Sequence, residues 1–292
     1  MDAERVLTAA AEAARAALAT VPAEPGAPKP DPILVADGLR RAFGGIVAVD
    51  VEHLEVQRGS ITALIGPNGA GKTTCFNLLT GFDQPDSGRW SFDGLDMAKM
   101  SPHRAAKLGM VRTFQLTKSL TKLPVIENMK LGARDQVGER LWRGLFKSSW
   151  GRQERQIEAR ADQLLERFKL SHVRDEYAGA LSGGQRKLLE MARALMTDPR
   201  LVMLDEPMAG VNPALKQSLN EHIRGLRDDG MTVLFVEHDM DMVHDISDWV
   251  IVMAEGRVIA EGTPDQISAN PAVIDAYLGA HQGSSLLEDE KP

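Results

Sequence analysis

Two glycine-rich stretches contain the residues best able to do chemistry in this chain. The first, Gly66 to Thr74, follows the pattern G-x-x-x-x-G-K-[ST]. Glycines let the backbone curl so that successive N–H groups face a phosphate, and a helix that begins there favours a polyanion at its N-terminus. The stretch therefore predicts a nucleotide-binding loop made by Gly66, Pro67, Asn68, Gly69, Ala70, Gly71, Lys72, Thr73 and Thr74.

The segments on either side of this loop support the prediction. Ile61 to Ile65 is a short apolar run typical of a buried strand, and Cys75 to Leu79 has a helical pattern. In such a loop Lys72 would place its ammonium between the β- and γ-phosphates, Thr73 would offer its hydroxyl to Mg²⁺, and Thr74 would lie near the α-phosphate. The alternative, a glycine-rich turn without a ligand, leaves the ordered strand, loop and helix unexplained.

The second glycine-rich stretch is Leu181-Ser182-Gly183-Gly184-Gln185, more than a hundred residues after the first. It makes chemical sense mainly as a group that closes over a nucleotide held elsewhere. The two stretches together suggest an ATP site completed by two chains. Ser182, Gly183, Gly184 and Gln185 are therefore predicted nucleotide contacts.

Two adjacent carboxylates follow another apolar run. Leu201 to Leu204 is typical of a buried parallel strand, and Asp205 and Glu206 come directly after it. Ligands bind at the carboxyl ends of such strands. Asp205 is predicted to hold Mg²⁺, usually through water, and Glu206 to polarise the water that attacks the γ-phosphate. The alternative is a strand that ends in a solvated turn.

Three further residues end strands or lie near a strand end. His238 follows the apolar run Val233 to Val236 and is predicted to contact the γ-phosphate. Gln115 follows a strand at Met110 to Phe114, from which its amide could reach Mg²⁺ and the attacking water. Phe43 could stack on an adenine ring. Two of them have an ordinary alternative, namely a surface or satisfied histidine for His238 and a core aromatic for Phe43. The predicted catalytic set is Glu206, His238, Gln115 and Lys72, and the predicted metal set is Thr73, Gln115 and Asp205.

Composition limits the classes of function. The 292 residues carry a net charge of −7, which argues against a large nucleic-acid-binding face. No run approaches the roughly 18 apolar residues of a membrane span, and the acidic N-terminus does not resemble a secretory signal. We therefore expect a chain that stays in the cytoplasm. Cys75 is the single cysteine, so an internal disulfide is excluded, and we expect it to be a small buried hydrophobe rather than a reactive thiol.

The order of predicted elements points to an α/β fold. Strands are expected at 201–204, 232–236, 249–253 and 258–260, with helices after Pro213, Asp239, Pro264 and Pro271. Residues 33–56 favour a β-rich edge subdomain, and helical patterns dominate from Pro124 to Leu195. This order predicts a parallel-sheet core with an inserted helical subdomain at about residues 116–198.

The ends of the chain and one insertion differ from this core in composition. Residues 1–32 are rich in alanine and proline and predict a flexible extension outside the core, and residues 281–292 form a polar tail. The main domain is expected at 33–280. The insertion 134–152 places Trp142, Phe146 and Trp150 among arginines and a lysine, which suggests an interface near the membrane domain or lipid headgroups. A local helical pair that packs its own tryptophans is the alternative.

From about Ile33 to Gly279 the chain resembles the ATP-binding subunits of ABC transporters. The motifs stand in family order: the Walker A loop at Gly66 to Thr74, the Q-loop at Gln115, the LSGGQ signature at Leu181 to Gln185, Walker B at Leu201 to Asp205 with Glu206, and the switch histidine His238. The resemblance implies a P-loop NTPase (RecA-like) core with an antiparallel β-subdomain and a helical signature subdomain. It also implies an ATPase in which two subunits face head to tail, so that Ser182 reaches the partner's γ-phosphate.

Within this family the chain is similar to subunits of importers for branched-chain amino acids and related polar solutes such as urea or short amides. Four segments carry the similarity: Val111 to Gln115, Val125 to Asn128, Ala209 to Pro213 and Ala276 to Gly279. The resemblance implies ATP and Mg²⁺, a second ATP-binding subunit, membrane permease subunits and, indirectly, an extracytoplasmic solute-binding protein. It also implies a location on the cytoplasmic face of the membrane.

The chain departs from the family's usual pattern at two positions, and three alternative functions remain open. Asn212 stands where the family's D-loop commonly ends in aspartate, which leaves a cross-dimer contact open, and Phe43 replaces the commoner tyrosine. An ATPase that moves lipid or lipopolysaccharide shares the Ala-Gly-Val segment and the Tyr-Leu-Gly ending. A non-transport ATPase acting on ribosomes or DNA is disfavoured because the chain has neither two ATPase halves nor a long coiled coil. A catalytically dead regulatory subunit is disfavoured by intact Lys72, Asp205, Glu206 and His238.

Overall fold

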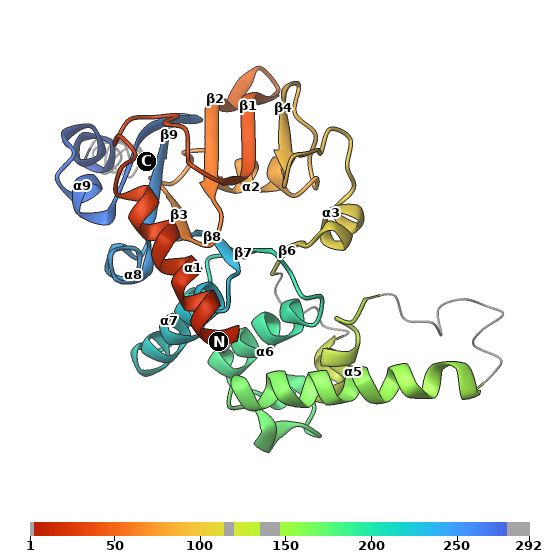
Figure 1. Ribbon diagram of the computed structural model, residues 1–292. Helices are drawn as coiled ribbons and strands as arrows, with labels where there is room; N and C mark the ends of the chain where they lie inside the picture. Colours follow the sequence, from red (N-terminus) through yellow and green to blue (C-terminus); the bar gives the residue numbers. More distant parts are fainter. Residues whose placement is uncertain (1–2, 114–119, 135–146, 279–292) are drawn as a thin grey trace, which may run out of the picture.

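The computed structural model describes residues 3–113, 120–134 and 147–278, which form two sheets with helices around them (Figure 1). The larger sheet has six strands in the order β10-β9-β3-β8-β7-β6. Five of these strands are mutually parallel and β10 is antiparallel to β9. The strands are β3 (Ile61–Ile65), β6 (Met110–Arg112), β7 (Leu201–Asp205), β8 (Thr232–Val236), β9 (Trp249–Ala254) and β10 (Arg257–Gly262).

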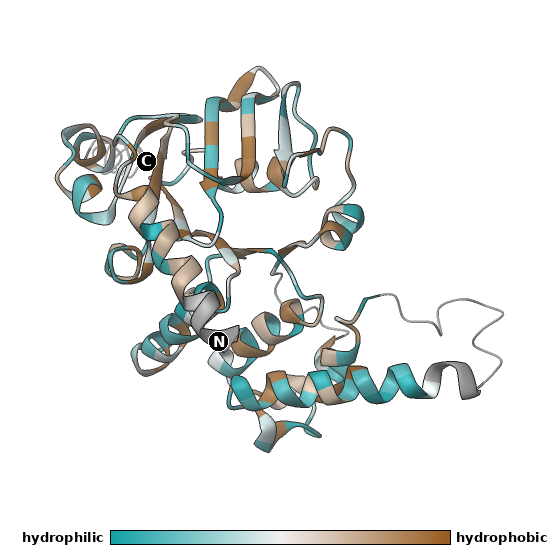
Figure 2. Ribbon diagram, in the orientation of Figure 1, coloured by the Kyte–Doolittle hydropathy of each residue, from teal (hydrophilic) through white to brown (hydrophobic). Residues whose placement is uncertain are grey.

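Burial on both faces explains why these strands are continuous apolar runs in the sequence. Every residue of β3 and β8 is buried, as are the first four residues of β7. Figure 2 shows the same strands as brown segments at the centre of the molecule. The predicted parallel-sheet core is thus confirmed, with boundaries within two residues of the expected ones.

The register of the parallel strands brings their carboxyl ends to one edge. Asp205 of β7 pairs with Val236 of β8, and Leu64 of β3 also pairs with Val236. The residues that follow β3, β7 and β8 therefore leave the sheet side by side. These are the three places where the sequence predicts a phosphate loop, two carboxylates and a histidine.

The smaller sheet is antiparallel, with strand order β2-β1-β4-β5, as expected for the edge subdomain. Its inner face packs on the core together with α2, because Trp90, Phe92 and Phe76 belong to one buried cluster. The strands are β1 (Pro32–Phe43), β2 (Ile46–Gln57), β4 (Ser87–Phe92) and β5 (Leu95–Asp96).

Helices of the main domain follow the sheet strands, and several have side-chain caps. Asn212, Asp239 and Thr263 each accept a hydrogen bond from the first turn of the helix that they precede. These helices are α2 (Lys72–Leu79), α3 (Pro102–Leu108), α7 (Pro213–Asp228), α8 (Met240–Ile246) and α9 (Pro264–Ser268), with a further helix at residues 271–278.

A helical part lies below the sheets in Figure 1 and contains the second glycine-rich stretch. Its helices α4 (Val125–Lys130), α5 (Lys147–Arg167) and α6 (Gly183–Leu195) pack together, with short 3₁₀ turns at Leu120–Lys122, Ser171–Val173 and Ala178–Ala180. Trp142 and Phe146, on which the interface hypothesis rests, lie outside the described residues, and so does the side chain of Trp150. That hypothesis stays a prediction.

The N-terminal segment differs from the expected flexible appendage. Residues Ala3–Leu18 form α1, whose small side chains Ala11 and Ala14 are buried together with Leu18. Val21 and Ala27 belong to the same buried cluster as the antiparallel sheet. Alanines and prolines carry little hydrophobic signal in a sequence, yet at helical spacing the small residues form a stripe that packs closely. The segment is therefore part of the folded core.

Lys29 anchors this segment through a buried ion pair. Its ammonium lies 2.8 Å from an oxygen of Glu261 and donates to the Ala27 carbonyl at 2.6 Å, with both charged side chains at most 2% exposed. The indole N–H of Trp249 donates to the same Glu261 oxygen at 2.9 Å, and the Lys29 backbone N–H donates to Glu55 at 2.5 Å. Two carboxylates from separate strands thus hold one residue of the N-terminal segment.

We expect Lys29→Ala to lower the free energy of unfolding by about 3–5 kcal/mol, because Glu261 would keep a buried charge without its cation. Arg15→Ala is the matched control, since Arg15 is 47% exposed, lies 3.7 Å from Asp248 and should contribute less than about 1 kcal/mol. Urea unfolding of both variants measures the difference. Equal, small losses would mean that the segment is not anchored through Lys29.

Candidate functional site

The loop between β3 and α2 can be formed only with glycine at two positions. Gly66 has φ +149° and Gly71 has φ +93°. A Cβ on Gly66 would lie 2.0 Å from the carbonyl oxygen of Met253, and one on Gly71 would lie 2.2 Å from that of Ala48. The loop is therefore held closely between the end of β9 and the start of β2, in the curled form that the sequence pattern predicts.

The N-terminus of α2 has the features of an anion site. Gly71 is its N-cap without any side-chain cap, and no acidic residue occupies the first turn. The Lys72 ammonium donates to the carbonyls of Gly66 at 2.7 Å and Pro67 at 2.9 Å. Burial lowers the pKa of Lys72, and the nearby Glu206 carboxylate partly opposes this. The charge of Lys72 thus lies over the loop, close to the carboxylates that end β7.

Residues from both predicted motifs line one pocket. Thr73 from α2, Asp205 at the end of β7 and Glu206 directly after it surround a space of about 330 Å³, together with Thr113, Lys187, Glu190 and Ala209. Residues 73 and 205 are far apart in the chain, and the parallel register brings them together. A hydroxyl and carboxylate oxygens are the hard donors that Mg²⁺ prefers, so the lining fits the metal that the sequence predicts.

Arg112 holds Asp205 on the side of α2, a contact that sequence reasoning missed. Its guanidinium lies 2.6 Å from an oxygen of Asp205 and 2.7 Å from the side-chain oxygen of Asn77, and its side chain is only 7% exposed. From the sequence, Arg112 was only part of a segment that marks a subgroup of the family. The available signal was an arginine at the end of the short strand β6, which pairs with the strand that carries the predicted metal ligand Asp205.

The backbone at Glu206 is strained. Its φ is +45°, a left-handed conformation that costs about 1–2 kcal/mol for a residue with a Cβ. Its N–H donates to the carbonyl of Val236 at 3.0 Å, which ties the turn to the end of β8. Such strain persists only where neighbouring contacts impose it, and it is concentrated at functional sites.

His238 lies next to this turn, and the residue before it makes the stronger contacts. The His238 side chain is 66% exposed, with Nδ1 3.7 Å from an oxygen of Glu237. The Glu237 side chain is fully buried and accepts hydrogen bonds from the backbone N–H groups of Met208 at 2.8 Å and His238 at 3.1 Å. Sequence reasoning missed Glu237, although an acid directly after a wholly apolar strand was the available signal.

Of the two remaining predicted site residues, the structure describes Phe43 but not Gln115. Phe43 ends β1 with 48% of its surface exposed, and the Arg41 guanidinium lies 4.7 Å from its ring centre. It is therefore an accessible aromatic face and not a core residue. Gln115 lies outside the described residues, so its predicted role stays a prediction.

The second glycine-rich stretch begins a helix in the other part of the molecule. Ser182 caps α6 and forms a capping box with Gln185, with hydrogen bonds of 3.3 and 2.9 Å. Ser182 and Gly183 are exposed, whereas Gly184 packs against Leu215. In Figure 1, α6 lies with α5 in the lower part, and α2 lies beside β1 and β2. The first turn of α6 is thus open to a contact from outside the chain.

The D-loop departure has a local explanation. The side-chain oxygen of Asn212 accepts a hydrogen bond from the Leu215 N–H at 3.0 Å and caps α7. Asparagine and aspartate are similarly good N-caps. The exchange therefore preserves the start of α7.

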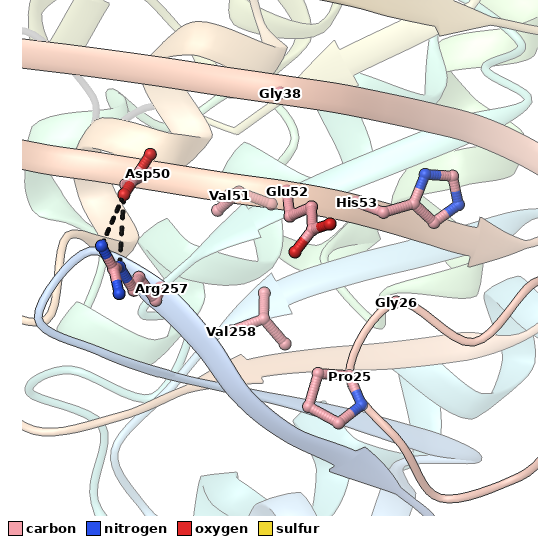
Figure 3. Close-up of a pocket in the computed structure, with 9 residues that line it drawn as sticks. All are labelled: Pro25, Gly26, Gly38, Asp50, Val51, Glu52, His53, Arg257 and Val258. Atoms are coloured by element: carbon pink, nitrogen blue, oxygen red, sulfur yellow. Dashed lines mark hydrogen bonds and ion pairs between the residues drawn. The ribbon is translucent and has the colours of Figure 1, made fainter.

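A larger pocket lies elsewhere and contains none of the predicted site residues (Figure 3). Its volume is about 650 Å³, and Pro25 and Gly26 of the N-terminal segment line it with His53. Asp50 and Arg257 form an ion pair at 3.0 Å across one end of it. Volume alone therefore does not identify the chemical site.

Comparison with known protein families gives two matches. Residues 49–209 match the family described as ABC transporter, which is more than half of the chain. Residues 257–282 match the family described as branched-chain amino acid ATP-binding cassette transporter. Within the described residues, no helix is both long and apolar enough to span a bilayer.

Several curated relatives match along nearly their whole length. A probable branched-chain amino acid transport ATP-binding protein, LivG, from Archaeoglobus fulgidus is 44% identical over 248 residues, which are 85% of this chain and 96% of that protein. The high-affinity branched-chain amino acid transport ATP-binding protein BraF of Pseudomonas aeruginosa is 43% identical over 250 residues, which are 85% of this chain and 98% of that protein.

Solved structures agree with the fold. An ATP-binding cassette of an ABC transporter in its ADP conformation superposes with a TM-score of 0.74 at 37% identity, covering 85% of this chain and 99% of the other. A nucleotide-free ATP-binding cassette gives a TM-score of 0.73 at 37% identity, with coverages of 84% and 98%. The predicted α/β P-loop NTPase fold is confirmed. With its phosphate loop, paired carboxylates and signature helix in these positions, the chain belongs to the ATP-binding proteins of ABC transporters.

Proposed function

We propose that this chain is the ATP-hydrolysing subunit of an ABC importer for branched-chain amino acids or related polar solutes. The observation that carries the proposal is the pocket in which Thr73 of the phosphate loop meets Asp205 and Glu206. The names of the relatives and the match at residues 257–282 favour amino-acid import over movement of lipid.

The phosphate loop and its neighbours would bind MgATP. The curled backbone of residues 66–74, with Lys72, would hold the β- and γ-phosphates, and Phe43 would stack on the adenine. Thr73 and Asp205 would hold Mg²⁺, which neutralises charge on the phosphates when it is bound. Asp205 is already fixed by Arg112, so little reorganisation of this carboxylate is needed.

Glu206 and His238 would both act at the γ-phosphate. The Glu206 carboxylate is proposed to accept a hydrogen bond from the attacking water and to polarise it. His238 is proposed to contact the γ-phosphate. Gln115 is proposed to help position the water and Mg²⁺. Phosphoryl transfer depends mostly on positioning and electrostatics, which the tied turn after β7 would provide.

The site is proposed to be completed by a second ATP-binding subunit. Ser182 and Gly183 are exposed at the first turn of α6, as a contact to a partner's nucleotide requires. Permease subunits would transmit the closing and opening of this dimer, with an extracytoplasmic solute-binding protein delivering the solute. The chain would then lie on the cytoplasmic face of the membrane.

We expect Glu206→Gln to lower the ATPase rate by about 10²–10⁴-fold, the usual contribution of a general base, while ATP binding persists. With MgATP the variant should accumulate as a dimer in size-exclusion chromatography. Asp198→Asn is the control, because Asp198 has the same left-handed backbone but is absent from the pocket lining. Normal hydrolysis by the Glu206 variant would remove Glu206 as the base.

Phe43→Ala should weaken MgATP binding by about 1–2 kcal/mol through loss of stacking, whereas Phe43→Tyr should bind normally. Ile46→Ala, which trims a neighbouring apolar side chain that is 76% exposed, should have little effect. Calorimetric titration with ATP in the Glu206→Gln background measures this. Unchanged affinity in Phe43→Ala would show that the adenine lies elsewhere.

The import assignment is tested by co-expressing this chain with permease subunits of a branched-chain amino acid importer from the same organism. Co-expression should give a complex, and its ATPase rate should rise when a binding protein loaded with leucine, isoleucine or valine is added. Stimulation by lipid and not by the loaded binding protein would contradict amino-acid import. The Glu206→Gln complex serves as the inactive control.

A further inference from the structure

Glu237 joins the two loops that carry the proposed catalytic side chains. Its carboxylate is fully buried directly after β8. One oxygen accepts the N–H of Met208 at 2.8 Å, and the other accepts the N–H groups of His238 at 3.1 Å and Asp239 at 3.5 Å. Met208 is only two residues after Glu206, so one side chain bridges the base loop and the histidine loop.

The Glu237 hydrogen bonds lie just beyond the point where backbone pairing between β7 and β8 ends. The ladder between β7 and β8 closes with Asp205 opposite Val236, and the Glu206 N–H still donates to the Val236 carbonyl at 3.0 Å. Beyond these residues, the segments that follow β7 and β8 are outside the paired ladder. The Glu237 side chain provides the acceptors that the next strand residue would otherwise have supplied.

The other end of the histidine loop is fixed independently. Asp239 accepts the Met242 N–H at 3.2 Å as the cap of α8 and forms an ion pair with Lys216 of α7. The pKa of Asp239 is lowered mainly by that hydrogen bond with Lys216. The backbone of His238 is thus held on both sides while its ring remains 66% exposed.

We propose that Glu237 is a positioning residue that sets the separation between Glu206 and His238, so that the attacking water and the γ-phosphate fit between them. The proposal rests on the proposed function. A carboxylate suits this position because it is an acceptor at both oxygens, and charged acceptors make stronger hydrogen bonds. Glutamine has the same shape but would turn an N–H group toward one of the backbone donors, leaving a buried donor unsatisfied.

A purely structural role would also make Glu237 sensitive to substitution, and Glu261 provides the comparison. Glu261 is 2% exposed and also accepts a backbone N–H, from Ala27 at 2.8 Å, but it lies beneath the N-terminal segment. Glu237→Gln and Glu261→Gln should both lower the melting temperature. Only Glu237→Gln should change the chemistry.

The test uses the full chain at a temperature where melting curves show every variant folded. We expect Glu237→Gln to lower kcat by about 10–100-fold with KM for MgATP within about threefold, because binding survives while alignment is lost. Glu261→Gln should keep both constants. In the Glu206→Gln background, Glu237→Gln should still form the ATP-dependent dimer.

Full turnover by Glu237→Gln, or equal loss in both glutamine variants, would overturn the proposal. If Glu237→Gln does not fold, Glu237→Asp keeps the charge but is one methylene too short to span both loops, so a normal kcat in that variant would overturn it equally. Retained hydrolysis in Glu206→Gln would instead indicate failure of the proposed function. The two failures are therefore distinguishable.

Discussion

The parallel register of β3, β7 and β8 is the constraint on which the site depends. Because Leu64 and Asp205 both pair with Val236, the three strands end together and release their following residues at one edge of the sheet. The phosphate loop lies more than a hundred residues before the two carboxylates in the sequence, and the histidine loop follows the carboxylates on the next strand of the sheet. A one-residue slip of any strand would exchange its faces and move its terminal side chains away from the others.

Buried charged groups set the geometry around that edge. Arg112 joins Asp205 to Asn77 of α2, and Glu237 joins the turn after β7 to the loop after β8. Charged side chains are costly to bury unless they are fully hydrogen-bonded, and this cost makes their geometry specific. Lys29 and Glu261 are also buried charges that pair with each other, far from the pocket, and their ion pair attaches the N-terminal segment to the core. The same physics thus fixes side chains of the candidate site at one place and attaches the N-terminal segment at another.

Backbone conformation provides the remaining specificity. Gly66 approaches the Met253 carbonyl too closely for any side chain, and Glu206 accepts a left-handed conformation despite its Cβ. Both features occur where a strand ends and the chain must turn sharply. Contacts with the sheet and within the loops hold these turns, such as the hydrogen bonds from Lys72 to the Gly66 and Pro67 carbonyls and from the Glu206 N–H to the Val236 carbonyl. At the start of α6, by contrast, Ser182 and Gly183 are exposed, as the proposed site shared between two subunits requires.

Much of this protein follows from its sequence. The glycine spacing of residues 66–71 requires a curled loop, and the apolar runs before Asp205 and His238 require buried parallel strands with polar residues at their ends. Local pattern reveals such features because each depends on neighbouring residues. The contacts of Arg112, Glu237 and Lys29 became visible only in the tertiary structure, since each depends on a partner from a distant segment. The same holds for the N-terminal segment, whose alanines gain their stabilising contacts only from the surface against which they pack.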